Sequence, residues 1–214
     1  KGIAIFIVML GHVLSWNQME DAYLYDAIKA VQMPLFILIS GYLCGIGRRV
    51  KTWKEYGAVL KKRACAYLVP FFFWIVLQHP LQPFSSIIET LYALDKGLWF
   101  LMTLFLLNWM IYTAQLAGAW AGVYEKWIFW AVYLGLAAFV VLETLLGWEF
   151  LSPGLTRLYL PFYLTGYAAG NHRGRLERIP EWGIRLSFGL ALPGFLFPVF
   201  FRDLQDVSSL LQLG

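Results

Sequence analysis

The chain has 214 residues, of which 60% are hydrophobic, 18% aromatic and only 14% charged. Soluble domains carry about 25% charged residues, so this composition excludes an ordinary soluble domain and favours one membrane domain over 1–214. The formal net charge of +4 comes mainly from Lys and Arg residues clustered in loops. Such clusters indicate membrane topology first, and we expect no binding of nucleic acid. The sequence has no P-loop, dinucleotide-binding glycine motif or zinc-ligand spacing, so we expect no metal, and we expect Cys44 and Cys65 to be free thiols.

Apolar segments that approach the roughly 20 residues needed to cross a bilayer recur along the chain. The expected spans are 2–16, 29–46, 64–80, 97–115, 127–147, 155–171 and 184–201. We therefore predict an all-α fold, a polytopic transmembrane helix bundle with about seven spans. The sequence begins on Lys1 inside an apolar segment and stops at Gly214 in a segment that looks unfinished, so we interpret it as a fragment truncated at both ends.

The connections between the spans predict the orientation of the bundle. The 47–63 connection carries seven Lys and Arg residues against Glu55, and the 171–183 connection carries three arginines. Because cytoplasmic loops are enriched in Lys and Arg, we expect both connections to be cytoplasmic. An alternating path through seven spans places these two on one side of the membrane. The connections expected on the opposite side are 17–28, 81–96 and 148–154.

Within 47–63, Trp53 and Tyr56 interleave with lysines. This pattern suits an amphipathic helix that lies along the inner interface of the membrane. The alternative is a cationic rim for a phosphorylated cytoplasmic substrate, because Arg and Lys are the usual partners of phosphate.

The first twelve residues place a cation, Lys1, and a histidine, His12, at the two ends of an uncharged apolar run. In a helix, eleven steps of about 100° bring both side chains to one face, about 16 Å apart along the axis. With 47–63 inside, Lys1 lies at the cytoplasmic face and His12 lies deep in the membrane. A neutral imidazole there can take a proton from a hydroxyl that attacks a carbonyl, or it can be a hydrogen-bonded packing residue.

Five motifs keep their order over positions 1 to about 170. They are Lys1-x10-His12, Met33-Pro34-Leu35-Phe36 with Ile39-Ser40-Gly41-Tyr42, Lys62-Arg63 before Leu68-Val69-Pro70-Phe71-Phe72, Leu98-Trp99-Phe100-Leu101, and Leu160-Pro161-Phe162-Tyr163-Leu164-Thr165-Gly166-Tyr167. Together they resemble the membrane-bound acyltransferase 3 family, with sugar O-acetylases of the fucose 4-O-acetylase type as the nearest subgroup.

The resemblance implies a bacterial inner-membrane enzyme of about ten spans. Such an enzyme moves an acyl group, commonly acetyl, from acetyl-CoA or another acyl-CoA to a hydroxyl of a sugar or cell-envelope glycan. It implies a catalytic role for His12, with Lys1 as the paired cation. Arg63 matches the first member of the family's Arg-x-x-Arg pair, but Ala66 stands at the second position, which leaves Lys61 or Lys62 as a substitute.

The remaining candidate residues follow from the charges of an acyl-CoA donor and from the needs of the acceptor. We expect the anionic end of the donor near an inner basic rim. The rim consists of Lys1, Lys61, Lys62 and Arg63. Trp99 and Tyr42 are candidates to stabilise the carbonyl oxygen, and Arg157 is a candidate to bind an anionic acceptor. Interface anchoring or packing is the alternative role for Trp99 and Arg157.

Two readings from other classes of protein stay open. One is a polytopic transporter or exporter, in which His12 is a proton-coupling site. The other is a structural membrane subunit, in which His12 only packs. Neither an internal repeat nor a pair of broken spans is visible in the sequence, so acyl transfer is the preferred reading. The residues do not indicate the acceptor, the acyl chain or the oligomeric state.

Overall fold

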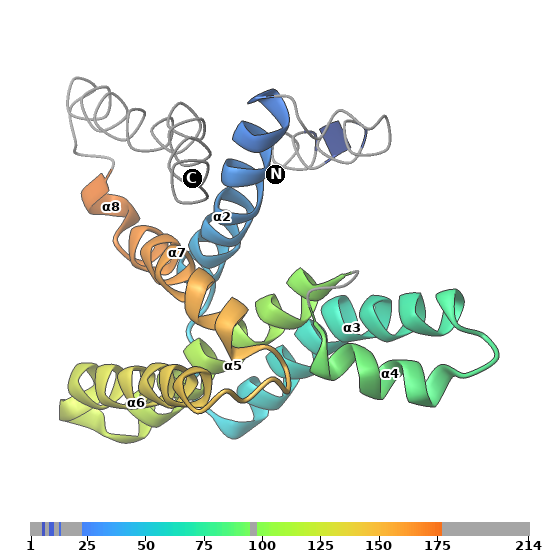
Figure 1. The fold of residues 1–214 in the computed structure, drawn as a ribbon. Helices are drawn as coiled ribbons and strands as arrows, with labels where there is room; N and C mark the ends of the chain where they lie inside the picture. The colour runs from blue at the N-terminus through green and yellow to red at the C-terminus, as the bar shows by residue number, and fades with distance from the viewer. Residues whose placement is uncertain (1–5, 7–8, 11–12, 14–22, 95–97, 177–214) are drawn as a thin grey trace.

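The computed structural model describes residues 6, 9–10, 13, 23–94 and 98–176 of the chain. Every regular element among these residues is a helix, which confirms the all-α prediction for this part (Figure 1). The helices are α2 (Tyr23–Gly45), α3 (Trp53–Gln78), α4 (Pro83–Tyr92), α5 (Trp99–Trp120), the 3-10 turn η1 (Gly122–Tyr124), α6 (Glu125–Leu145), α7 (Pro153–Asn171) and α8 (Arg173–Leu176). The expected spans at 2–16 and 184–201 lie outside the described residues.

Helix α5 is the centre of the described bundle. It packs against α3, α6, α7 and α2, and Figure 1 shows it between α6 on one side and the α3–α4 pair on the other. In its most apolar window 61% of the residues are buried, against 6% in the corresponding window of α6. An all-round apolar helix is stable only when it is surrounded by protein or lipid. Helix α5 therefore occupies the interior, and α6 lies at the periphery.

Two helices in the described part of the chain are long and apolar enough to cross a membrane, Trp99–Trp120 and Gly122–Leu145. They coincide within a few residues with the spans expected at 97–115 and 127–147. Helix α7 coincides similarly with the span expected at 155–171. The count of seven spans in this chain, like the larger count implied by the family resemblance, stays a prediction.

Helix α3 differs most from the expectation. Residues 53–63 do not form a separate interfacial helix, because they are the first half of one continuous helix, Trp53–Gln78. Its start is fixed by two hydrogen bonds. Glu55 N donates to Thr52 Oγ1 at 3.2 Å, and Lys51 N donates to Glu55 Oε2 at 2.9 Å. This cap satisfies backbone groups that the first helical turn leaves unpaired, so the helix begins before the apolar segment.

Helices α2 and α7 cross more closely than any other described pair, because both carry glycines four residues apart at the contact. A Cβ added to Gly41 would meet Tyr163 O, and one added to Gly45 would lie 2.8 Å from Asn171 N. Gly166 and Gly170 face α2 in the same way. Small residues at this spacing let two backbones touch, which is the packing device of membrane helices.

The connections meet in two groups, at opposite ends of the bundle. At one end, the 46–52 connection meets the end of α7, where Arg49 Nη2 donates to Asn171 Oδ1 at 2.7 Å. At the other end, Leu151 N donates to Leu91 O at 2.8 Å. For the described parts of these connections, this grouping agrees with the one predicted from alternating spans; residues 17–22 and 177–183 lie outside the described residues. We call the first group, formed by 46–52, the 121–124 turn and the end of α7, the basic end; the side of the membrane that it faces stays a prediction.

Candidate functional site

The two residues at the centre of the sequence argument, Lys1 and His12, lie outside the described residues. Their roles as paired cation and base therefore stay predictions. The structure describes the other candidates, and it separates them into different environments.

The expected rim on α3 is not a single surface. Lys61 and Lys62 are exposed, whereas Arg63 is half-buried and turns toward α5. Its Nη1 donates to Tyr67 Oη at 3.3 Å, and its Nη2 donates to Tyr112 Oη at 3.2 Å. Successive helical residues point about 100° apart, so Lys62 and Arg63 do not share one face of α3. Arg63 is thus a cation that enters the helix interface, apart from the two lysines.

The candidates Trp99 and Arg157 lie toward the end of the bundle opposite to the basic end. The Trp99 ring stacks on Tyr159, with ring centroids 5.3 Å apart and an interplanar angle of 25°. Arg157 is exposed and precedes Tyr159 by two residues on α7. Tyr42 lies elsewhere, at the α2–α7 crossing, where its backbone contacts the Gly166 and Gly170 positions. The structure therefore groups Trp99 with the start of α7 but does not bring Tyr42 to them.

A polar cavity of about 460 Å³ opens at the basic end. We call it the basic pocket. Its lining combines cationic and hydrogen-bonding side chains from four parts of the chain, namely Arg49, Lys51, Gln115, Glu125, Lys126, Tyr167, Asn171 and His172, with apolar neighbours such as Phe129 and Trp130. Arg49 and Lys51 belong to the 47–63 connection, for which a cationic rim was one of two interpretations, and the other polar residues were not among the candidates taken from the sequence.

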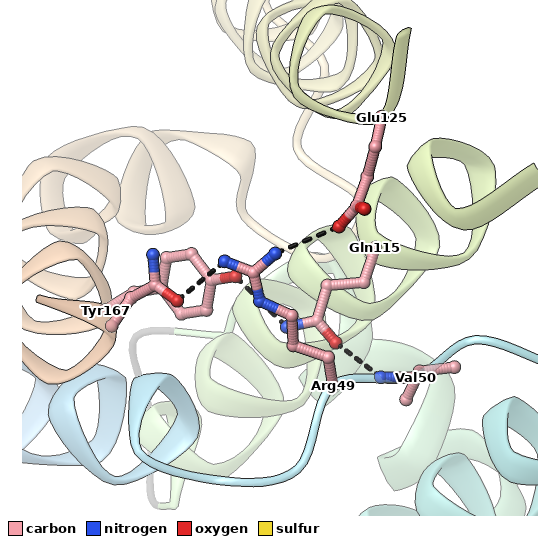
Figure 2. A network of polar contacts seen from close by, with 6 residues as sticks. Arg49, Val50, Gln115, Glu125 and Tyr167 are labelled. Carbon is pink, nitrogen blue, oxygen red and sulfur yellow. Dashed lines mark hydrogen bonds and ion pairs between the residues drawn. The ribbon is translucent and has the colours of Figure 1, made fainter. Parts of the chain in front are cut away.

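The core of the basic pocket is a network around Arg49, which Figure 2 shows. Its Nη1 donates to Glu125 Oε1 at 2.9 Å, and its Nη2 donates to Asn171 Oδ1 at 2.7 Å. Guanidinium groups make such paired, directional contacts through their planar set of donors. One side chain thereby joins the 46–52 connection to the start of α6 and the end of α7.

Gln115 of α5 forms the floor beneath this network (Figure 2). Its Oε1 accepts a hydrogen bond from Val50 N at 3.0 Å, and its Nε2 donates to Tyr167 Oη at 3.1 Å. All three residues are buried. A buried amide with both groups satisfied fixes the position of its partners. A signal for it existed in the sequence, because a polar residue inside an apolar span is costly and marks a functional position.

A second cavity, of about 570 Å³, lies between α5 and α6 and is lined mainly by apolar side chains such as Phe105, Leu136 and Phe139. Glu143 and the buried Thr156 are its polar members. Among the described residues no group of three metal-ligating side chains comes together.

The described part of the chain is an all-helical bundle that has apolar helices long enough to cross a membrane and a cationic cavity at one end. The profile of the acyltransferase domain, acyltransferase 3, matches residues 1–211. The chain therefore belongs to the acyltransferase 3 family, which confirms the resemblance carried by the five motifs.

Two relatives are nodulation proteins named NolL. The chain is 32% identical over 129 residues to NolL of Mesorhizobium japonicum, which covers 50% of this chain and 32% of that protein. It is 36% identical over 83 residues to NolL of Sinorhizobium fredii, which covers 36% of this chain and 22% of that protein. The match thus spans a third or less of each relative's length. No solved structure matches the chain significantly.

Proposed function

We propose that the protein transfers an acyl group from an acyl-CoA donor, acetyl-CoA in the simplest case, to a hydroxyl of a sugar or cell-envelope glycan. The observation that carries this proposal is the acyltransferase-domain match over residues 1–211, which includes both Lys1 and His12. We further propose that the protein works in the bacterial inner membrane with its basic end toward the cytoplasm. The gathering of Arg49, Lys51 and Lys126 at that end supports this orientation, because positive residues favour the cytoplasmic side.

In the proposed mechanism His12 is the general base. Its imidazole accepts the proton of the acceptor hydroxyl while the hydroxyl oxygen attacks the thioester carbonyl carbon. A new C–O bond forms, the C–S bond breaks, and the CoA thiolate leaves and takes up the proton from the imidazolium. Hydrogen-bond donors are needed where negative charge develops on the carbonyl oxygen, and Tyr42 and Trp99 are the candidates for that role.

The donor and acceptor approach from different ends in this proposal. Lys1, Lys61 and Lys62 attract the anionic donor in this proposal, and Arg63 offers a charge inside the bundle, where it donates to two tyrosine hydroxyls. Arg157 is exposed near the opposite end, so it is placed to meet an anionic acceptor. In this proposal the donor and the acceptor meet at His12, where the acyl group passes directly from one to the other.

The test uses membranes that contain the protein, labelled acetyl-CoA and a panel of glycans, with label on a glycan hydroxyl as the readout. We expect His12→Ala to lower transfer by about 10²–10⁴-fold, the usual contribution of a general base. Lys1→Glu is expected to weaken donor binding. His79→Ala is the matched control, because His79 follows the end of α3 near the opposite end of the bundle.

The control variant should retain transfer, and all variants should insert into the membrane in equal amounts. Full transfer by the His12→Ala variant would remove the role of His12 as general base. Unchanged donor affinity in the Lys1→Glu variant would remove the paired cation from donor binding.

A further inference from the structure

We propose that the basic pocket binds the phosphate-bearing end of the donor, and that the Glu125 carboxylate competes with phosphate for the Arg49 guanidinium. This inference rests on the proposed function, because it names where the nucleotide diphosphate of that donor binds. It moves the donor site from the exposed lysines of α3 to a different set of residues, none of which the motifs mark.

The charge of the pocket favours an anion. Three cations, Arg49, Lys51 and Lys126, line it against one carboxylate, Glu125, so the difference of three and one leaves a formal charge of +2. Helix α6 begins at Glu125, directly after the 3-10 turn η1, so the positive end of its helix dipole lies at the pocket. Charge and helix direction thus act together at one place.

The contact between Arg49 and Glu125 is well suited to exchange. The two side chains are 46% and 48% exposed, and the Nη1 to Oε1 distance is 2.9 Å. Ion pairs with this exposure are screened by solvent and contribute little to stability. The diphosphate of the donor carries two negative charges, against one for the carboxylate, and has more oxygens that can accept hydrogen bonds from the guanidinium. Replacement of Glu125 by phosphate therefore loses little and gains a stronger partner.

The rest of the network keeps the guanidinium in place during such an exchange. Asn171 Oδ1 accepts from the other terminal nitrogen of Arg49 at 2.7 Å. The next residue, Val50, is buried and held through its N–H by Gln115 Oε1 at 3.0 Å. A site whose cation is oriented before binding loses less entropy when the ligand arrives. The pocket volume of about 460 Å³ also falls within the range of small-molecule sites, which is about 300–1,000 Å³.

A polar stripe leads from the pocket into the bundle. Gln115, Tyr112 and Asn108 follow one another at three and four residues along α5, so they share one helix face. The stripe covers about 10 Å at 1.5 Å per residue. Arg63 Nη2 donates to Tyr112 at its middle. Tyr112 and Asn108 are buried and lie outside the pocket lining, so the stripe connects the basic pocket to Arg63 through packed side chains.

The decisive test asks whether two substitutions that each remove a charge change ligand affinity in opposite directions. Binding of CoA and of inorganic pyrophosphate to the purified protein in detergent is measured by calorimetric titration at low salt. We expect Arg49→Gln to weaken both affinities by about tenfold or more, because it removes the bidentate cation. We expect Glu125→Gln to strengthen both by several-fold, because the competing carboxylate is gone. Equal affinity in the Arg49→Gln variant, or weaker binding in the Glu125→Gln variant, would overturn the proposal.

A purely structural role of the ion pair gives a different pattern, since both variants would then lose stability and affinity together. Arg49→Lys keeps the charge but not the paired donors, so it should bind with intermediate affinity even where Arg49→Gln folds poorly. Lys126→Gln and Lys54→Gln make the same charge change, and Lys54 is exposed on α3 away from the pocket lining. Only Lys126→Gln should weaken pyrophosphate binding. If both variants weaken it equally, binding depends on the net charge of the protein and not on this pocket.

The same variants are assayed for acyl transfer, which separates this inference from the proposed function. If neither substitution changes the rate of acyl transfer, the basic pocket is not the donor site, and the proposed acyltransferase activity still stands. If the two substitutions change pyrophosphate affinity in opposite directions but no acyl group is transferred to any hydroxyl, the phosphate site stands and the proposed reaction is wrong.

Discussion

Replacing Gly166 by alanine would force α2 and α7 apart where their backbones touch. A Cβ at this position would meet Leu38 O and would lie 2.9 Å from both Leu38 C and Tyr42 N. Non-bonded carbon contacts are favourable at about 3.5–4.0 Å, and the atoms in the way belong to a helix backbone that has no rotamer to change. The two helices must therefore separate by roughly 1 Å at the crossing.

The expected cost can be worked from this geometry. Overpacking a close contact costs about 1–3 kcal/mol, and the higher helix propensity of alanine returns up to about 1 kcal/mol. We expect a net loss near the upper end of that difference, about 2 kcal/mol, because backbone and not side-chain atoms are struck. For a chain of this size that loss lowers the melting temperature by about 4–8 °C.

The assay is thermal unfolding of the detergent-solubilised protein, followed by circular dichroism. Gly135→Ala is the matched control, since Gly135 lies in α6 with no atom within 4 Å of the added Cβ. That variant should melt at or above the temperature of the parent. A Gly166→Ala variant as stable as Gly135→Ala would refute the close crossing of α2 and α7.

Three further predictions concern the network at the basic end and the start of α3. Gln115→Leu should cost about 1–3 kcal/mol in the free energy of unfolding and weaken pyrophosphate binding, because Val50 N and Tyr167 Oη lose their partner. Thr52→Ala removes the cap of α3 and should cost about 1 kcal/mol, again measured by thermal unfolding. The hydrogen bond from the backbone N–H of Lys51 holds the pKa of Glu55 below its usual value. A lowered folded pKa stabilises the fold above the unfolded pKa, and this contribution disappears as the pH falls through the folded pKa. Glu55→Gln should therefore reduce the loss of thermal stability on acidification below about pH 4.

The helices of the second half of the chain were predictable from the sequence because they are isolated apolar runs between polar connections. Helices α5, α6 and α7 lie within a few residues of the expected spans. The start of α3 was missed although a local signal exists. Thr52 and Glu55 are spaced as in a capping box, and this cap starts the helix well before the apolar run. Hydropathy alone finds the apolar part of a helix, not its first turn.

The basic pocket could not be predicted in the same way. Its central contacts join residues 49, 125 and 171, which meet only because α2 and α7 cross and because α5 and α6 return to the same end of the bundle. Periodicity and loop charge predicted that these connections share one end. They did not indicate which of the many cations would be oriented by a neighbour, since that depends on the tertiary position of Asn171 and Gln115.

The departure at Ala66 has a different meaning once α3 is seen as one helix. Ala66 is exposed, whereas Arg63 turns inward to Tyr112 and Tyr67. Positions three apart in a helix differ by only about 60° in direction, but Ala66 is exposed to the outside of α3 while Arg63 points to α5. Absence of an arginine there therefore removes no partner from the interior site of Arg63. In the proposed donor site, Arg49, Lys51 and Lys126 are the further cations that a polyanionic donor needs, and they lie where the polar stripe of α5 begins.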